Sequence, residues 1–195
     1  MAFNVDNFRT TMQFDGARPN LFEVVLQFPS FVELAPQAQQ LSRFYVKTAQ
    51  LPGSTIGVVN VPYFGREVKV AGNRTFADWS VTVLNDEDFT IRNAFERWHR
   101  AINGNKTNLR APNAVNTSPL SPGTSYAVDA EVYQYSKAGG SPIKKYRFVG
   151  MFPQDLAPID LDWGSNDTIE EFSVTLSYQY WESEDTKSAV PQASA

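Results

Sequence analysis

The sequence predicts a mainly β fold, in which two antiparallel sheets pack as a barrel or sandwich with one flanking α-helix. Three observations carry this prediction. Aromatic residues, which favour strands, make up 13% of the 195 residues. Segments that alternate apolar and polar residues recur along the chain between turn sequences. Apolar residues follow a clear helical spacing in one segment, at about 87–103. Many short strands with one helix fit a barrel or sandwich.

The first part of the chain is expected to form four strands, at residues 21–28, 43–50, 56–63 and 66–71. Segment 29–41, rich in proline, glutamine and alanine, is interpreted as a loop. Glycine then marks the ends of strands. Gly53 follows Leu51 and Pro52, and Gly65 and Gly72 flank the fourth strand. Gly53 and Gly72 are expected to permit turns.

The clearest alternation covers residues 79–84, where Trp79 shares one face with valines and the other face carries Ser80 and Thr82. The periodicity then changes to that of a helix. Residues 85–88 supply an N-cap and an acidic first turn for this helix. Its apolar stripe comprises Ile91, Ala94, Phe95, Trp98 and Ile102. Residues 105–125, dense in Asn, Pro, Ser and Thr, predict a long surface loop.

The last part of the chain is again strand-rich. Strands are expected at 127–135 and 143–150 around a turn at 138–141, followed by a short extended piece at 158–162 and a final strand at 172–181. The side chains expected to anchor the core are Trp79, Phe95, Trp98, Trp163 and Trp181. The predicted organisation is an N-terminal arm at 1–16, one domain at 17–182 and a flexible tail at 183–195.

The composition argues against several function classes. The chain has no cysteine and one histidine, His99, so we expect no catalytic residues, no cofactor and no metal. A calcium loop at 160–166 is disfavoured, since Trp163 and a misplaced glycine fit a turn better. No signal peptide or membrane-spanning stretch is expected, which predicts assembly in a cytoplasm.

The charge distribution argues against tight binding to DNA. The net charge is −4, whereas proteins that grip phosphates usually carry a basic surplus. The densest basic stretch is 144–147, and alternation places Lys145 and Arg147 on one strand face. A solvated face is favoured there over a nucleic-acid contact.

Long strands with unprotected edges favour self-association, because copies can pair their edges around a ring. The segment from Leu51 to Gly72 is the expected inter-subunit arm. Its expected contact residues are Leu51, Pro52, Gly53, Tyr63, Gly65 and Gly72. Composition alone is also compatible with an ordinary soluble β domain.

Residues 70–86, from Val-Ala-Gly-Asn-Arg to Val-Leu-Asn-Asp, strongly resemble the tail tube proteins of contractile-tailed bacteriophages. Four further stretches match in the same order: 17–22, 49–53, 161–166 and 169–182. The last of these ends in Tyr180, Trp181 and Glu182. The resemblance covers about residues 15–182.

The resemblance implies a β-barrel with a flanking helix, assembled as six-membered rings that stack into a hollow tube. Its implied partners are further copies of the chain, the tail sheath protein, and the baseplate and tail terminator proteins. A length-measuring (tape-measure) protein and double-stranded DNA would occupy the lumen without tight binding. The implied location is the virion, the implied role is genome ejection, and the family offers no catalytic residues.

Two alternatives stay open alongside this function. One is the tube subunit of a phage-like bacteriocin or contractile injection system, which shares the fold. The other is a baseplate protein that initiates the tube and is present in fewer copies. An enzyme is a distant third, because His99 has no evident catalytic partners in the sequence.

Overall fold

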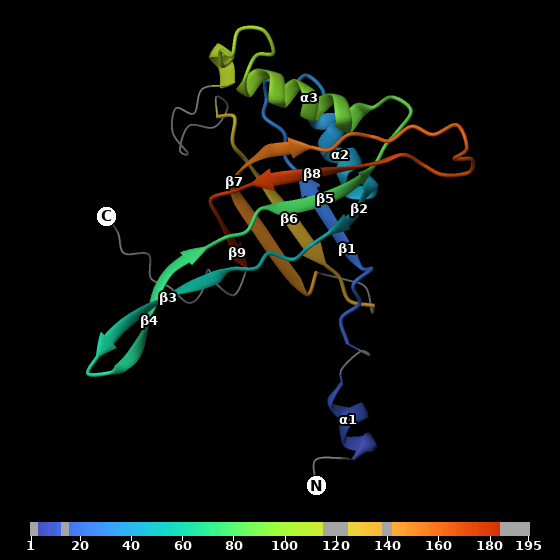
Figure 1. Ribbon diagram of the computed structural model, residues 1–195. Helices are drawn as coiled ribbons and strands as arrows, with labels where there is room; N and C mark the ends of the chain where they lie inside the picture. The colour runs from blue at the N-terminus through green and yellow to red at the C-terminus, as the bar shows by residue number, and fades with distance from the viewer. Residues whose placement is uncertain (1–3, 13–15, 115–124, 138–141, 184–195) are drawn as a thin grey trace.

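The computed structural model describes residues 4–12, 16–114, 125–137 and 142–183. They form a barrel of two sheets with two helices at one end, a hairpin that projects from the barrel and a short helix that lies apart (Figure 1). The elements are α1 Val5–Thr11, β1 Phe22–Leu26, α2 Ala35–Tyr45, β2 Val46–Ala49, β3 Thr55–Tyr63, β4 Arg66–Thr75, β5 Trp79–Leu84, α3 Thr90–Ile102, the 3-10 helix Pro112–Ala114, β6 Val128–Gln134, β7 Lys144–Leu156, β8 Glu171–Ser177 and β9 Tyr180–Ser183. No helix among the described residues is long and apolar enough to cross a bilayer.

The two sheets of the barrel share β7 and so join into one seven-stranded antiparallel sheet, in the order β1-β6-β7-β8-β5-β2, with β9 paired to β7. Strand β7 belongs to both layers. Its first half pairs with β6 and β9, and its second half pairs with β8. The core lies between the layers and includes Trp79, Phe148 and Phe172. The predicted fold class is therefore confirmed: two packed antiparallel sheets with helical cover.

The bend that lets β7 serve both layers lies at Gly150, whose φ is +66°. The Gly150 N–H donates to Asp129 Oδ1 (3.1 Å), and the Gln179 N–H donates to the carbonyl of Val149 (3.0 Å). A Cβ at position 150 would lie 3.0 Å from Gln179 Cγ. Left-handed backbone and close packing both favour glycine at this corner.

Gly150→Val is expected to destabilise the fold by about 1–3 kcal/mol, because a β-branched residue is strained at positive φ. Thermal unfolding followed by circular dichroism measures the loss. Gly53→Val is the matched control, since a Cβ at Gly53 meets no atom within 4 Å. Equal melting temperatures for the two variants would show that the corner tolerates a side chain.

Helix α3 confirms the predicted stripe, with Ile91, Ala94, Phe95 and Trp98 all buried. It begins at Thr90, slightly later than the predicted 87. The N-cap is Phe89, whose φ is +53°, and no acidic residue lies in the first turn, so the N-cap and acidic first turn predicted at 85–88 are wrong. Asp86 lies beside the helix start, because its Oδ1 accepts the Thr90 N–H at 2.9 Å. The core prediction is likewise confirmed for Trp79, Phe95 and Trp98, which are at most 2% exposed.

The interpretation of 29–41 as a loop is confirmed for 29–34 and is wrong from Ala35 onward, because α2 begins at Ala35 and runs to Tyr45. The strand predicted at 43–50 accordingly shortens to Val46–Ala49. Helix α2 covers the edge of β1 that β6 leaves free. The Ser42 hydroxyl accepts the Leu26 N–H (3.2 Å) and donates to the carbonyl of Gln39 (2.8 Å). A helix side chain thus satisfies a backbone N–H at the buried edge of β1.

The C-terminal region differs from the prediction in three ways. Strand β7 continues beyond 150 to Leu156, no strand forms at 158–162, and the strand predicted at 172–181 is divided into β8 and β9. The division falls at Gln179, next to the Gly150 corner. The predicted turn at 138–141, part of the 105–125 loop and nearly all of the tail lie outside the described residues.

The core prediction is wrong for Trp163, whose side chain is fully exposed (101%). It lies in the loop between β7 and β8, at a turn that Asp162 organises. Asp162 Oδ1 accepts the Gly164 N–H at 2.9 Å, and the Asp162 carbonyl accepts the Ser165 N–H at 3.1 Å. The turn thus places Trp163 at the loop tip instead of in the core.

Candidate functional site

The most distinctive feature of the surface is the β3–β4 hairpin, a two-stranded sheet that projects from the barrel (Figure 1). It follows β2 and leads into β5, so it extends the direction of that strand pair. Every residue of β3 is exposed, as is nearly all of β4. At its tip, Phe64 (φ 43°) and Gly65 (φ 79°) form the two-residue turn. Positive φ at both positions is typical of a type I′ hairpin turn.

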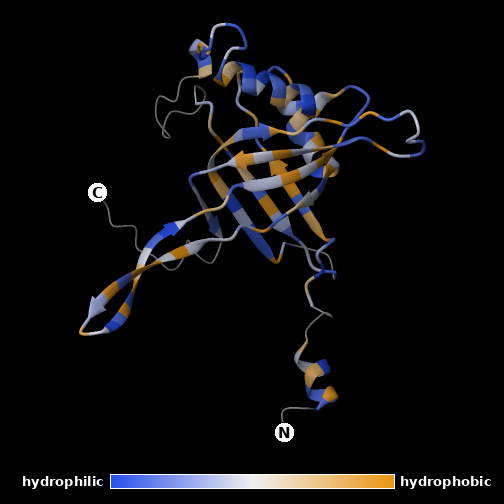
Figure 2. Cartoon of the chain, in the orientation of Figure 1, coloured by the Kyte–Doolittle hydropathy of each residue, from blue (hydrophilic) through white to orange (hydrophobic). Residues whose placement is uncertain are grey.

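One face of this hairpin is apolar and has no partner within the described chain. Val59 pairs with Val70 and Val61 pairs with Val68, so the four side chains share a face. Their exposed fractions are 52%, 49%, 44% and 48%, respectively. Figure 2 shows the alternating hydrophobic bands along the hairpin. Since an isolated two-stranded hairpin is only marginally stable, this valine face indicates an interaction surface.

The base of the hairpin is fixed to the barrel by two indole rings. Trp79 Nε1 donates to the carbonyl of Gln50 (2.8 Å), and Trp181 Nε1 donates to that of Gly53 (3.1 Å). The Arg74 guanidinium lies 5.1 Å from the Phe76 ring and 5.2 Å from the Trp181 ring. Trp181 packs at the margin of the core and is only partly buried. It holds the hairpin base more than it fills the core.

The predicted arm residues all lie in or next to this hairpin, although the glycine roles differ from expectation. Gly72 does not form a turn. It lies within β4 opposite Gly57, where the register shifts, and a Cβ there would lie 3.1 Å from the Gly57 carbonyl oxygen. Gly53 has open space around it. Leu51 and Pro52 lie with Gly53 between β2 and β3, Tyr63 lies beside the tip and Gly65 forms the turn.

Gly72→Val is expected to leave the melting temperature of the monomer unchanged and to impair its self-assembly. A side chain at this position collides with the Gly57 backbone and changes how the hairpin bends, and the atoms nearest to its Cβ all belong to the hairpin itself. Circular dichroism and sedimentation velocity measure the two effects. Gly53→Val, in open space, is the control, and normal assembly of Gly72→Val would refute this role for Gly72.

The outer face of β6 and β7 carries paired charges. Lys145 Nζ lies 3.0 Å from Glu131 Oε1, and Arg147 pairs with Asp129. Burial alone would raise the pKa of Glu131, but hydrogen bonds from Tyr133 and Lys145 outweigh burial and lower it. The hydrogen bond to Glu131 raises the pKa of Lys145. Lys145 and Arg147 of the densest basic stretch are thus paired with carboxylates and do not form a bare phosphate-binding surface.

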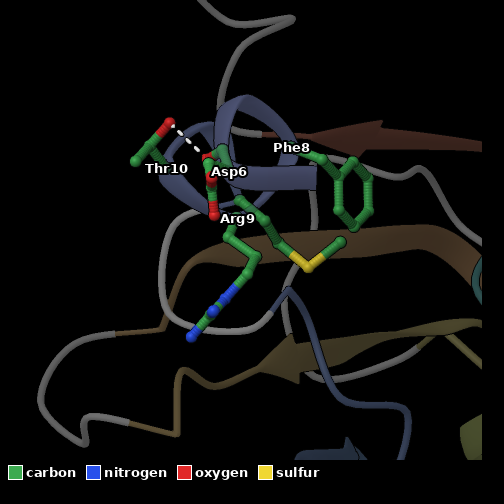
Figure 3. A pocket seen from close by; sticks show the side chains of 5 residues that line it. Asp6, Phe8, Arg9 and Thr10 are labelled. Atoms are coloured by element: carbon green, nitrogen blue, oxygen red, sulfur yellow. Dashed lines mark hydrogen bonds between the residues drawn. The ribbon is translucent and has the colours of Figure 1, made fainter. Parts of the chain in front are cut away.

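The rest of the described surface offers little chemistry. No three His, Asp or Glu side chains gather to hold a metal within the described ranges. Burial lowers the pKa of His99, an effect that Asp155 partly offsets. The hollow in Figure 3 lies beside α1 and is lined by Asp6, Phe8, Arg9, Thr10 and Met12. All five belong to α1 or its C-cap, so among the described residues no second element lines this hollow.

Comparisons with known proteins agree with one another. A family model described as "Phage tail tube protein" matches residues 17–184. Tail tube protein gp19 of Enterobacteria phage T4 is 32% identical over 168 residues, covering 86% of this chain and 92% of that protein. The tail tube protein of Serratia phage KSP90 is 28% identical over 176 residues, covering 89% and 93%, respectively.

Two solved structures show the same fold at low sequence identity. The tube terminating cap of the anti-feeding prophage has a TM-score of 0.61 at 15% identity, covering 87% of this chain and 91% of that chain. A chain from the sheath-tube complex of an extracellular contractile injection system has a TM-score of 0.53 at 13% identity, covering 93% and 99%.

Proposed function

Since this chain belongs to the phage tail tube protein family, and is therefore a structural component of the virion, we propose that its copies form six-membered rings that stack into the inner tube of a contractile tail. The observation that carries the proposal is the projecting hairpin with its half-exposed valine face. A face of this kind is unfavourable in water and is covered when copies associate.

The tube is proposed to conduct the genome into the host cell. Double-stranded DNA and a tape-measure protein pass through the lumen without tight binding. Two observations support a wall that does not hold phosphates: the net charge of −4 and the carboxylate partners of Lys145 and Arg147. A lumen lined mostly by Lys and Arg in the assembled tube would contradict this part of the proposal.

The remaining partners follow from the same proposal. The tail sheath surrounds the tube, and baseplate and terminator proteins contact its two ends. The fold neighbours include a chain of a sheath-tube complex and a tube terminating cap, which supports these contacts. Assembly takes place in the host cytoplasm, and the protein has no enzymatic role. The relatives by sequence are phage proteins, which favours a phage tube over an injection device or a baseplate initiator.

Negative-stain electron microscopy of the purified protein tests the proposal. As the concentration rises, rings and then hollow rods of constant diameter are expected, and their averages should show sixfold symmetry. Counting copies per particle in purified virions distinguishes a tube subunit, which is abundant, from a baseplate initiator. A protein that stays monomeric at high concentration and is absent from the shaft of the particle would end the proposal.

A further inference from the structure

A second exposed apolar segment lies in the loop between β7 and β8, residues 157–170. Leu161 is 80% exposed, Ile169 is 68% exposed and Trp163 is fully exposed. The loop has a defined shape around these side chains, because Asp162 accepts two backbone N–H groups and Ser165 Oγ lies 2.9 Å from Thr168 Oγ1. Large apolar side chains held out in water in this way are typical of interfaces.

This loop is also strongly acidic. Residues 157–170 contain four carboxylates and no basic residue: Asp160, Asp162, Asp167 and Glu170. Glu170 is partly buried and accepts a hydrogen bond from Asn85 (3.0 Å). The three aspartates are exposed and form no ion pair with any described residue. The loop therefore combines an exposed indole with uncompensated negative charge.

The tip of the β3–β4 hairpin has the complementary character. Phe64 is 93% exposed and Tyr63 is 64% exposed, with their rings 4.7 Å apart. The hairpin carries Arg66, Lys69 and Arg74 against one acidic residue, Glu67. Neither Arg66 nor Lys69 forms an ion pair within the described chain. Exposed aromatic rings with positive charge match a surface of exposed apolar groups with negative charge.

The two surfaces cannot meet within one copy, because they lie at opposite ends of the molecule (Figure 1). The hairpin projects at the lower left of this view, and the loop joining β7 to β8 projects at the right. Two different, complementary patches on one chain produce head-to-tail contacts, which close into rings or continue as filaments.

We propose that the hairpin tip of one copy docks on the β7–β8 loop of a neighbouring copy. Phe64 packs against Trp163, and Arg66, which pairs with Tyr63 beside the turn, faces Asp160 and Asp162. The buried aromatic contact supplies most of the affinity, while the exposed charges fix the orientation. This inference rests on the proposed tube function and adds the surface on which the hairpin docks.

The absence of cysteine allows a direct cross-linking test. One protein carries Tyr63→Cys and a second carries Asn166→Cys, which leaves Phe64 and Trp163 in place. The two are mixed under conditions in which tubes form and are treated with a short bismaleimide. A covalent dimer is expected in the mixture, and neither protein alone should give it in comparable yield. Leu109→Cys, at a residue 70% exposed on another loop, replaces Asn166→Cys as the control.

A charge exchange provides the second arm. Arg66→Glu alone and Asp160→Lys alone are each expected to raise the protein concentration needed for tubes about tenfold or more, because like charges then face one another. The double variant should restore assembly. Tubes that form without the 63–166 cross-link, or single and double variants that assemble alike, would overturn the contact and leave the tube function standing. Native protein that forms no tubes would overturn both.

Discussion

Trp98→Ala is expected to remove about 3–5 kcal/mol from the free energy of unfolding, as truncation of a fully buried indole usually does. Trp98 has no exposed surface and lies where α3 meets the barrel. Its ring stacks on Phe95 with centroids 6.1 Å apart and meets the edge of Phe28 at 5.8 Å. Its Nε1 donates to the carbonyl of Tyr126 (2.8 Å), which loses its partner in the variant. Urea unfolding followed by tryptophan fluorescence measures the loss.

The matched control for this substitution is Trp163→Ala, which deletes the same side chain from a fully exposed position. It should change the free energy of unfolding by less than about 0.5 kcal/mol. If Trp98→Ala does not fold at all, Trp98→Phe provides a measurable intermediate, because it keeps most of the apolar volume and loses the N–H donor. Similar losses at positions 98 and 163 would show that burial does not set the stability of this domain.

The same comparison shows what could be predicted from the sequence. Apolar and polar residues alternate along 79–84, and the strand has one buried and one polar face. This two-residue period identifies both the strand and its inward-facing residues. In α3, the helical spacing of the apolar residues likewise identifies both the helix and its buried face. Size and hydrophobicity alone placed Trp163 in the core, but its neighbours form a turn, and a turn overrides the burial preference of one side chain.

Helix α2 could not be predicted in this way because its stability is tertiary. Its buried residues are Ala35, Ala38 and Ser42, two small residues and a polar one, so its apolar stripe is weak. The helix forms where it covers β1. There the Ser42 hydroxyl accepts the Leu26 N–H, a contact that only the folded chain brings together. A pattern of hydrophobic residues contains no signal for such a partner.

The candidate site was located by its glycines, but its valine face was overlooked although the sequence contains the signal. Counting outward from the Phe64-Gly65 turn pairs Val61 with Val68 and Val59 with Val70, which the structure shows. Only the barrel reveals that this face is uncovered, because exposure depends on where the hairpin points. Sequence therefore predicts the pairing within the hairpin, and the fold determines its availability to a partner.

The division between barrel and hairpin has a mechanical consequence for a tube. The barrel is stabilised by its own core, and two indole N–H groups fix the hairpin base to it, so the hairpin direction is set before any partner arrives. A preoriented hairpin loses less conformational entropy on binding than a free one. Contacts that each contribute little binding free energy can then form a rigid assembly, because every copy repeats them.

Val61→Glu combined with Val68→Lys is expected to abolish tube assembly and leave the monomer folded. The two positions face each other across the hairpin, so opposite charges there are compatible with the strand pair. The valines have no buried partner in the barrel, and the melting temperature should therefore stay the same. In the tube, loss of two apolar contacts costs about 2 kcal/mol per interface, which corresponds to about a 30-fold weaker association. Burial of the two charges adds to this cost.

The control for the double substitution is Asn60→Glu, which places a carboxylate opposite Lys69 on the other face of the same hairpin. It tests whether added charge at this location is itself harmful, and the variant should still assemble. Sedimentation velocity and negative-stain microscopy across a concentration series measure all three proteins. If the doubly charged valine face forms tubes at the native concentration, that face is not buried between copies, and the association must depend on the hairpin tip or on the strand edges. Because tip and face are changed by different substitutions, their contributions can be measured separately in one assembly assay.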